Sequence, residues 1–315
     1  MRPVNVTLFS LSLLLFTVAG VSAQDEDTIE VLTEIVNVSV AVNDKEGGQV
    51  QNLSKDDFVL YDNGKLTDIA FFSGREAPIS YGIVYDLHPT TAGQSKSILR
   101  ALEAFTDGLG DREDFFLTIF NEYGSLNINF IPTPDQVARH LSFGERNEPN
   151  SLYDAVYLAG RKLRERANQK KTLILISDGK DHQSHHGFKE LERLFESFSV
   201  QIYGVILDDR DFWDYNELSI GREPSRLEID KSGLDAAAIK AISRDSGGDA
   251  SSSERNAVNL YGIFERISND MRGRYSLGFY PSGGGSHSLQ IEMKVRKRNE
   301  YSLRYRNSYR VPKNE

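Results

Sequence analysis

The sequence contains no cysteine among its 315 residues. Disulfide bonds, thiolate metal sites, a cysteine nucleophile and a lipid anchor on cysteine are therefore excluded. Positive charge is also scarce, since 37 lysine and arginine residues face 46 aspartate and glutamate residues, which gives a net charge of −9. A general nucleic-acid binder needs a basic surface, so we do not expect this class of protein.

Long apolar runs are limited to one, from Leu8 to Gly20. Residues 1–23 are typical of a secretory signal peptide, because Arg2 precedes this run and the small residues Val21-Ser22-Ala23 follow it. The alternative is an uncleaved membrane anchor, for which the run is short. We expect cleavage before Gln24, a mature protein that is secreted or located in the periplasm or cell envelope, and no membrane span thereafter.

Motifs of catalysis are missing too. The sequence has no Gly-x-Ser-x-Gly elbow, P-loop, His-Glu-x-x-His or complete dinucleotide fingerprint. The glycine-rich run from Ser282 to Ser286 precedes no helix that would help to bind a phosphate, so it predicts a flexible connection. We therefore expect no enzyme, no catalytic residues and no organic cofactor.

Two flanking regions, 24–77 and 274–315, have the alternating pattern of β-strands. Val36, Val38, Val40 and Val42 alternate with polar or small residues. The sequence Asp62-Asn-Gly64 predicts a hairpin turn before a strand from Leu66 to Phe72. The few strands of either flank cannot form a stable domain alone. We therefore expect both flanks to pair in one antiparallel β-sandwich.

The region between them, 78–273, alternates buried-type strands with amphipathic helices. This alternation predicts a doubly wound, mostly parallel sheet with helices on both faces, inserted into the sandwich. The expected strands are Ser80–Tyr85, Phe115–Phe120, Leu126–Ile131, Thr172–Ser177 and Gln201–Leu207, with the second and third as an antiparallel edge pair. The expected helices are Ser95–Leu109, Pro134–Leu141, Ser151–Ala167, Phe188–Phe198, Leu234–Asp245 and Ala257–Arg272.

Three segments should meet at the edge where the parallel strands end, which we call the rim. They are Asp86-Leu-His-Pro-Thr90, Glu148-Pro-Asn-Ser-Leu-Tyr-Asp-Ala155 and Leu173-Ile-Leu-Ile-Ser-Asp-Gly-Lys-Asp181. In this order they resemble a von Willebrand factor type A domain. The flanks, including Arg274-Tyr-Ser-Leu-Gly-Phe-Tyr-Pro281, resemble the secreted "VWFA-related" proteins of acidobacteria.

This resemblance implies a metal-ion-dependent adhesion site at the rim, where a partner's acidic side chain completes the shell of a divalent cation. Asp86 and Asp178 match the two aspartates of the family pattern, and Thr90 matches its second serine. His88 replaces the first serine, and Asn150 stands where a threonine belongs. The site is therefore degenerate. It is expected to hold Mg²⁺, a transition metal suited to imidazole, or no cation.

Other features of the sequence have two interpretations each. His182, His185 and His186 follow Asp178 and either supply a transition-metal site or belong to a solvated loop. A long loop with Phe212, Trp213 and Tyr215 either anchors a partner or packs onto the protein. The positively charged side chains of the last strands either contact an anionic surface or form a solvated face. These residues are Lys294, Arg296, Lys297, Arg298, Arg304, Arg306, Arg310 and Lys313.

Three functions follow from these observations. The first is a non-enzymatic adhesion module that binds a protein partner at the rim. The second is a structural component of the cell envelope whose rim is inert. The third is a metal-dependent hydrolase that uses the histidine-rich part of the rim.

Overall fold

A computed structural model describes residues 35–87, 95–121, 124–137, 151–181, 184–207, 236–253, 258–294 and 300–311. Thr33–Glu315 belong to one compact unit. Several predictions lie outside the described residues: the signal peptide 1–23, His88, Thr90, Asn150, His182 and the loop with Phe212, Trp213 and Tyr215. None of the helices in the described ranges is long and apolar enough to cross a membrane.

A six-stranded sheet lies at the centre of the α/β region, with the order β10-β9-β8-β5-β6-β7. Its strands are β5 (Ile79–Asp86), β6 (Asp114–Asn121), β7 (Gly124–Ile128), β8 (Lys170–Ser177), β9 (Gln201–Leu207) and β10 (Asp249–Ser253). Neighbours run parallel except β6 and β7, which pair antiparallel as expected. All residues of β5 and β9 are buried, which explains their nearly continuous apolar sequence.

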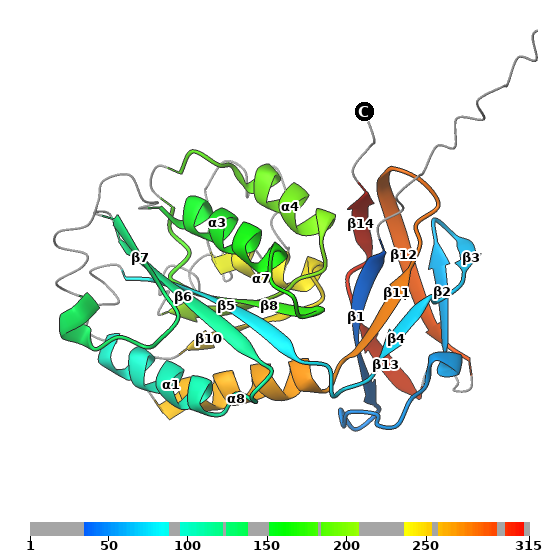
Figure 1. Ribbon diagram of the computed structural model, residues 1–315, viewed down its shortest axis with the longest axis horizontal. Coiled ribbons are helices and arrows are strands. Elements are labelled where there is room, and N and C mark those ends of the chain that lie inside the picture. Colours follow the sequence, from blue (N-terminus) through cyan, green and yellow to red (C-terminus); the bar gives the residue numbers. More distant parts are fainter. Residues whose placement is uncertain are drawn as a thin grey trace, which may run out of the picture. The chain divides into compact units, whose positions relative to one another are not determined.

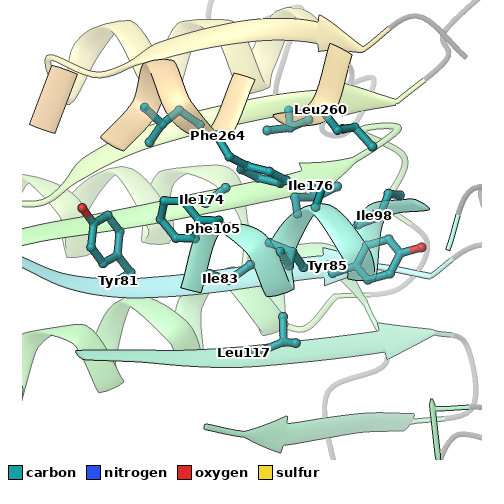
Figure 2. Packing of buried hydrophobic residues seen from close by; sticks show 14 of the residues in the cluster. Tyr81, Ile83, Tyr85, Ile98, Phe105, Leu117, Ile174, Ile176, Leu260 and Phe264 are labelled. Atoms are coloured by element: carbon teal, nitrogen blue, oxygen red, sulfur yellow. The ribbon is translucent and has the colours of Figure 1, made fainter. Parts of the chain in front are cut away.

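Helices cover both faces of this sheet, α1 and α8 on one and α3, α4 and α7 on the other (Figure 1). Their bounds are α1 (Ser95–Asp107), α3 (Leu152–Arg164), α4 (Phe188–Ser197), α7 (Ala236–Asp245) and α8 (Val258–Arg272). Figure 2 shows Tyr81, Ile83 and Tyr85 of β5 among side chains of α1 and α8, such as Phe105 and Phe264. The predicted doubly wound α/β sheet is therefore confirmed.

Two antiparallel sheets form the sandwich, with the orders β13-β1-β11-β4 and β14-β12-β2-β3. Their strands are β1 (Val36–Asp44), β2 (Phe58–Asp62), β3 (Lys65–Thr67), β4 (Phe71–Ser73), β11 (Tyr275–Phe279), β12 (Gly285–Met293), β13 (Tyr301–Arg304) and β14 (Ser308–Val311). Each sheet combines strands from both flanks, as predicted. The short helix η1 (Lys55–Asp57) precedes β2.

The hairpin turn falls where the sequence predicts it, because Asn63 and Gly64 adopt φ angles of 49° and 76° between β2 and β3. The single strand expected from Leu66 to Phe72 is wrong. It is divided into β3 and β4, which belong to different sheets. The connection buries Ile69 in the core of the sandwich, and this carries the chain from one sheet to the other.

A buried ion cluster joins α8 to the sandwich. Arg274 is fully buried, and its guanidinium donates hydrogen bonds to the carbonyl oxygens of Ser39 and Gly247 and to the Asp270 carboxylate. Arg304 of β13 also pairs with Asp270, with 2.6 Å between Nη2 and Oδ1. The α/β region and the flanks therefore share charged contacts as well as chain connections.

Candidate functional site

The rim begins with Asp86, the last residue of β5. Its neighbour β8 pairs Ile176 with Tyr85, which places Ser177 beside Asp86. The Ser177 hydroxyl donates to Asp86 Oδ2 at 2.7 Å and itself accepts from the Gly179 backbone N–H at 2.9 Å. Two of the predicted site residues, Asp86 and Asp178, therefore lie at the ends of adjacent parallel strands. Both are buried.

Burial sets the electrostatics of this pair. Desolvation, together with the negative charges of Asp178 and Asp181, raises the pKa of Asp86 to about 7, although the Ser177 hydrogen bond opposes the shift. Asp178 accepts from the Lys180 backbone N–H at 3.0 Å and lies 3.7 Å from the Lys180 ammonium. The rim is thus a place where carboxylates repel one another and where a cation would be stabilised.

The donor chemistry of this region fits a hard cation. Asp86, Ser177 and Asp178 offer carboxylate and hydroxyl oxygens, the ligands that Mg²⁺ and Ca²⁺ prefer. The other predicted ligands, His88, Thr90 and Asn150, lie outside the described residues. Within the ranges that the structure describes, no three His, Asp or Glu side chains are grouped closely enough to hold a metal ion.

A second centre of the rim is Asp154, in the first turn of α3. The backbone N–H groups of His185 and His186 donate to its two carboxylate oxygens at 3.1 and 3.0 Å. The Nδ1 atoms of the two imidazoles lie 3.1 and 2.6 Å from the same oxygens, and the Ser151 hydroxyl lies 3.2 Å away. Burial opposes ionisation of Asp154, but these hydrogen bonds outweigh it and hold its pKa well below the usual value.

The loop after β8 also caps the amino end of α3. The backbone N–H of Tyr153 donates to the Asp181 carboxylate and that of Asp154 to the Ser184 hydroxyl, each at 3.3 Å. Ser184 in turn donates to Asp181 at 2.6 Å. These groups satisfy N–H donors that a helix leaves free at its first turn. The loop and the helix therefore form one hydrogen-bonded structure.

Both described histidines of this loop converge on Asp154. The ring of His186 also stacks on Tyr157, with 3.8 Å between centroids and 18° between planes. Because Nδ1 of each ring faces the carboxylate, Nε2 is the ring nitrogen available to another ligand, more so in exposed His185 than in His186.

Asp154 is the organising residue that the sequence analysis did not assign. The signal for it is its position three residues after Ser151, where a helix favours a carboxylate near its free N–H groups. Its pairing with histidines some thirty residues later has no sequence signature, because this pairing depends on how α3 packs against the parallel strands β5 and β8.

Fold and rim define a doubly wound α/β protein with a carboxylate-rich edge, as the resemblance to von Willebrand factor A domains implied. Neither a family model nor a curated protein matches the sequence. Three solved structures that are similar to this chain have low identities and TM-scores.

The first is an aerotolerance-related membrane protein from Bacteroides fragilis, 13% identical with a TM-score of 0.40, covering 61% of this chain and 98% of that one. The ArnB paralog VWA2 from Sulfolobus acidocaldarius is 12% identical with a TM-score of 0.40, and the match covers 89% of this chain and 76% of that one. The pilus adhesin SpaC from Lactobacillus rhamnosus GG is 8% identical with a TM-score of 0.38, and the match covers 87% of this chain and 48% of that one. The fold assignment rests on the strand order and not on these likenesses.

Proposed function

We propose that this protein is a non-enzymatic adhesion module of the cell exterior or envelope, which binds a protein partner at the rim around Asp86 with the help of one divalent cation. The observation that carries the proposal is the buried carboxylate pair Asp86 and Asp178 at the ends of two adjacent parallel strands. Crevices at this edge of open α/β sheets are where such folds bind their ligands.

Repulsion among the rim carboxylates supports a cation there. The pKa of Asp86 is raised to about 7 by burial and by the charges of Asp178 and Asp181, so a cation beside Asp86 would offset an existing cost. A cation held mainly by hydroxyls and few carboxylates keeps positive charge and would bind an acidic side chain of a partner. In this proposal Asp86 is the central ligand, Thr90 supplies a hydroxyl, and Asp178 acts directly or through a water.

Of the two residues that depart from the family pattern, His88 and Asn150, His88 is the one expected to decide which cation the site prefers. Imidazole suits Zn²⁺ or Cu²⁺ better than Mg²⁺, so His88→Ser should strengthen Mg²⁺ binding if the site is a degenerate adhesion site. The same change should weaken Zn²⁺ binding if His88 is a ligand of a transition metal. Asn150 would supply an amide oxygen in either case.

Calorimetric titration of Mg²⁺ and Zn²⁺ into the wild type, Asp86→Ala and His88→Ser tests the cation part of the proposal. We expect binding of at least one cation to the wild type and none to Asp86→Ala. Asp111→Ala is the matched control, since this exposed acid precedes β6 at the opposite edge of the sheet. Absence of heat from either metal in all four proteins would contradict cation binding and favour an envelope component with an inert rim.

A further inference from the structure

A cavity of about 250 Å³ lies far from the rim, where the start of β8 meets the end of β14. Four of its lining residues are cations, namely Arg164, Lys171, Arg306 and Arg310, and no acidic residue lines it in the described part of the chain. Lys171 lies near the start of β8 and Asp178 just beyond its end, so the two sites are about 20 Å apart. In a protein with net charge −9, such a concentration of positive charge is unusual.

Arg306 is the most enclosed of these cations. Only 4% of its surface is exposed, so it does not belong to the solvated face that the sequence suggested as one interpretation. Its Nη1 donates to the Phe198 carbonyl at 3.2 Å and its guanidinium lies over the Tyr309 ring, but its buried Nε has no hydrogen-bond partner among the described residues. A buried guanidinium whose N–H donors are not all satisfied is costly, and an anion in the adjoining cavity would offset its charge.

In the described part of the chain, no carboxylate forms an ion pair with this guanidinium. The carboxylate whose charge acts on it is that of Glu196, which pairs with Arg310 at 3.3 Å. Burial lowers the pKa of Arg306 to about 10, and burial together with the positive charge of Arg164 lowers the pKa of Lys171. Lys171 donates to the Arg164 carbonyl at 2.8 Å, which leaves two of its three N–H donors for other acceptors.

We propose that this cavity binds a small anionic molecule through a phosphate or carboxylate group that pairs with the buried guanidinium of Arg306. The exposed side chains of Arg164 and Arg310 line the cavity and attract the anion, while Arg306 supplies a buried positive charge that suits either group. The site is independent of the rim and of the function proposed for it.

Calorimetry with two probes, inorganic phosphate and citrate, tests the site in the full protein at an ionic strength of about 0.15 M, where weak surface attraction is screened. Phosphate and carboxylate sources are distinguished by which probe binds more tightly. Arg306→Met keeps the apolar stem and removes the guanidinium, and it should raise the Kd of the preferred probe at least about tenfold. Arg164→Gln should raise it about threefold, because its charge is exposed.

The matched control is Arg161→Gln, which removes an exposed arginine from the same helix outside the cavity and should leave the Kd unchanged. Asp86→Ala should also leave it unchanged, which separates this site from the rim. Failure of both probes to bind the wild type, or equal binding by folded Arg306→Met, would overturn the proposal. If circular dichroism shows that Arg306→Met does not fold, Arg164→Gln becomes the deciding variant. An increase in its Kd no greater than that of Arg161→Gln would then overturn the proposal.

Discussion

Lys170 shows at the scale of one residue how this fold tolerates a buried charge. It is the first residue of β8, only 1% exposed, and its ammonium donates to the Arg75 carbonyl at 3.1 Å. Burial, and then the positive charges of Arg274 and Arg75, lower its pKa to about 8. The folded protein therefore favours the neutral form of the Lys170 amine at a lower pH than the unfolded chain does.

This shift gives a pH dependence of stability with a definite sign. Between about pH 8 and the ordinary lysine pKa of about 10.4, the unfolded chain binds more protons at Lys170 than the folded one, so stability increases as pH rises. We expect this site to add about 2 kcal/mol to the free energy of unfolding between about pH 8 and about pH 10. Urea denaturation of Lys170→Met at both pH values should lack this gain, and an equal gain in the variant would contradict the assignment.

At the scale of an element, the loop after β8 contacts α3 at two places, through the Asp154 carboxylate and through Asp181 and Ser184 at the amino end of the helix. Asp154 accepts from the backbone N–H and imidazole of both His185 and His186. Asp154→Ala should release the His185–His186 part of the loop while the sheet stays folded, because the apolar packing of α3 on β5 and β8 does not depend on this side chain. Hydrogen exchange of the His185 and His186 amides should become at least about tenfold faster.

The control for this prediction is Asp107→Ala, which removes an exposed acid from the end of α1. Exchange at the two histidine amides should be unchanged in that variant. Protection of these amides in Asp154→Ala at the wild-type level would show that the loop is held by other contacts.

The elements that the sequence predicts well are those whose burial is uniform. β5 and β9 are buried along their whole length, so their apolar runs define them, and the predicted β9 has the observed limits. The edge strand β10 has the sequence Asp-Ala-Ser-Ser-Ser and was not predicted, because only pairing with β9 makes it a strand. β14 was likewise expected only as general β character, since it too lies at the edge of a sheet.

The site was predictable only in part. Asp86 ends one apolar strand and Asp178 directly follows another, which places both at the rim. Parallel pairing of the two strands then brings these residues close together. The histidines left two interpretations open, since nothing in their spacing indicates that His185 and His186 both bind Asp154. The sequence left Arg306 with two interpretations, contact with an anionic surface or a solvated face, and neither indicates its burial, because that depends on contacts with distant segments such as Phe198.

At the scale of the whole molecule, the α/β region and the sandwich are coupled through Asp270. Burial opposes its ionisation, but Arg274 and Arg304 more than compensate and lower its pKa. Asp270→Ala would leave the fully buried Arg274 without its carboxylate, and breaking a buried pair in this way costs about 3–5 kcal/mol. Thermal unfolding should shift downward as a single transition, whereas an unchanged midpoint would contradict this coupling.

The proposed function of the molecule requires that the rim bind a protein partner through Asp86 and a divalent cation. The most direct measurement is quantitative capture from the native envelope fraction, with mature wild-type, Asp86→Ala and Asp111→Ala proteins as parallel baits, each with and without chelator. We expect a partner that wild type and Asp111→Ala retain and that both Asp86→Ala and the chelator release. Retention of the same proteins by Asp86→Ala and in the presence of chelator would contradict it.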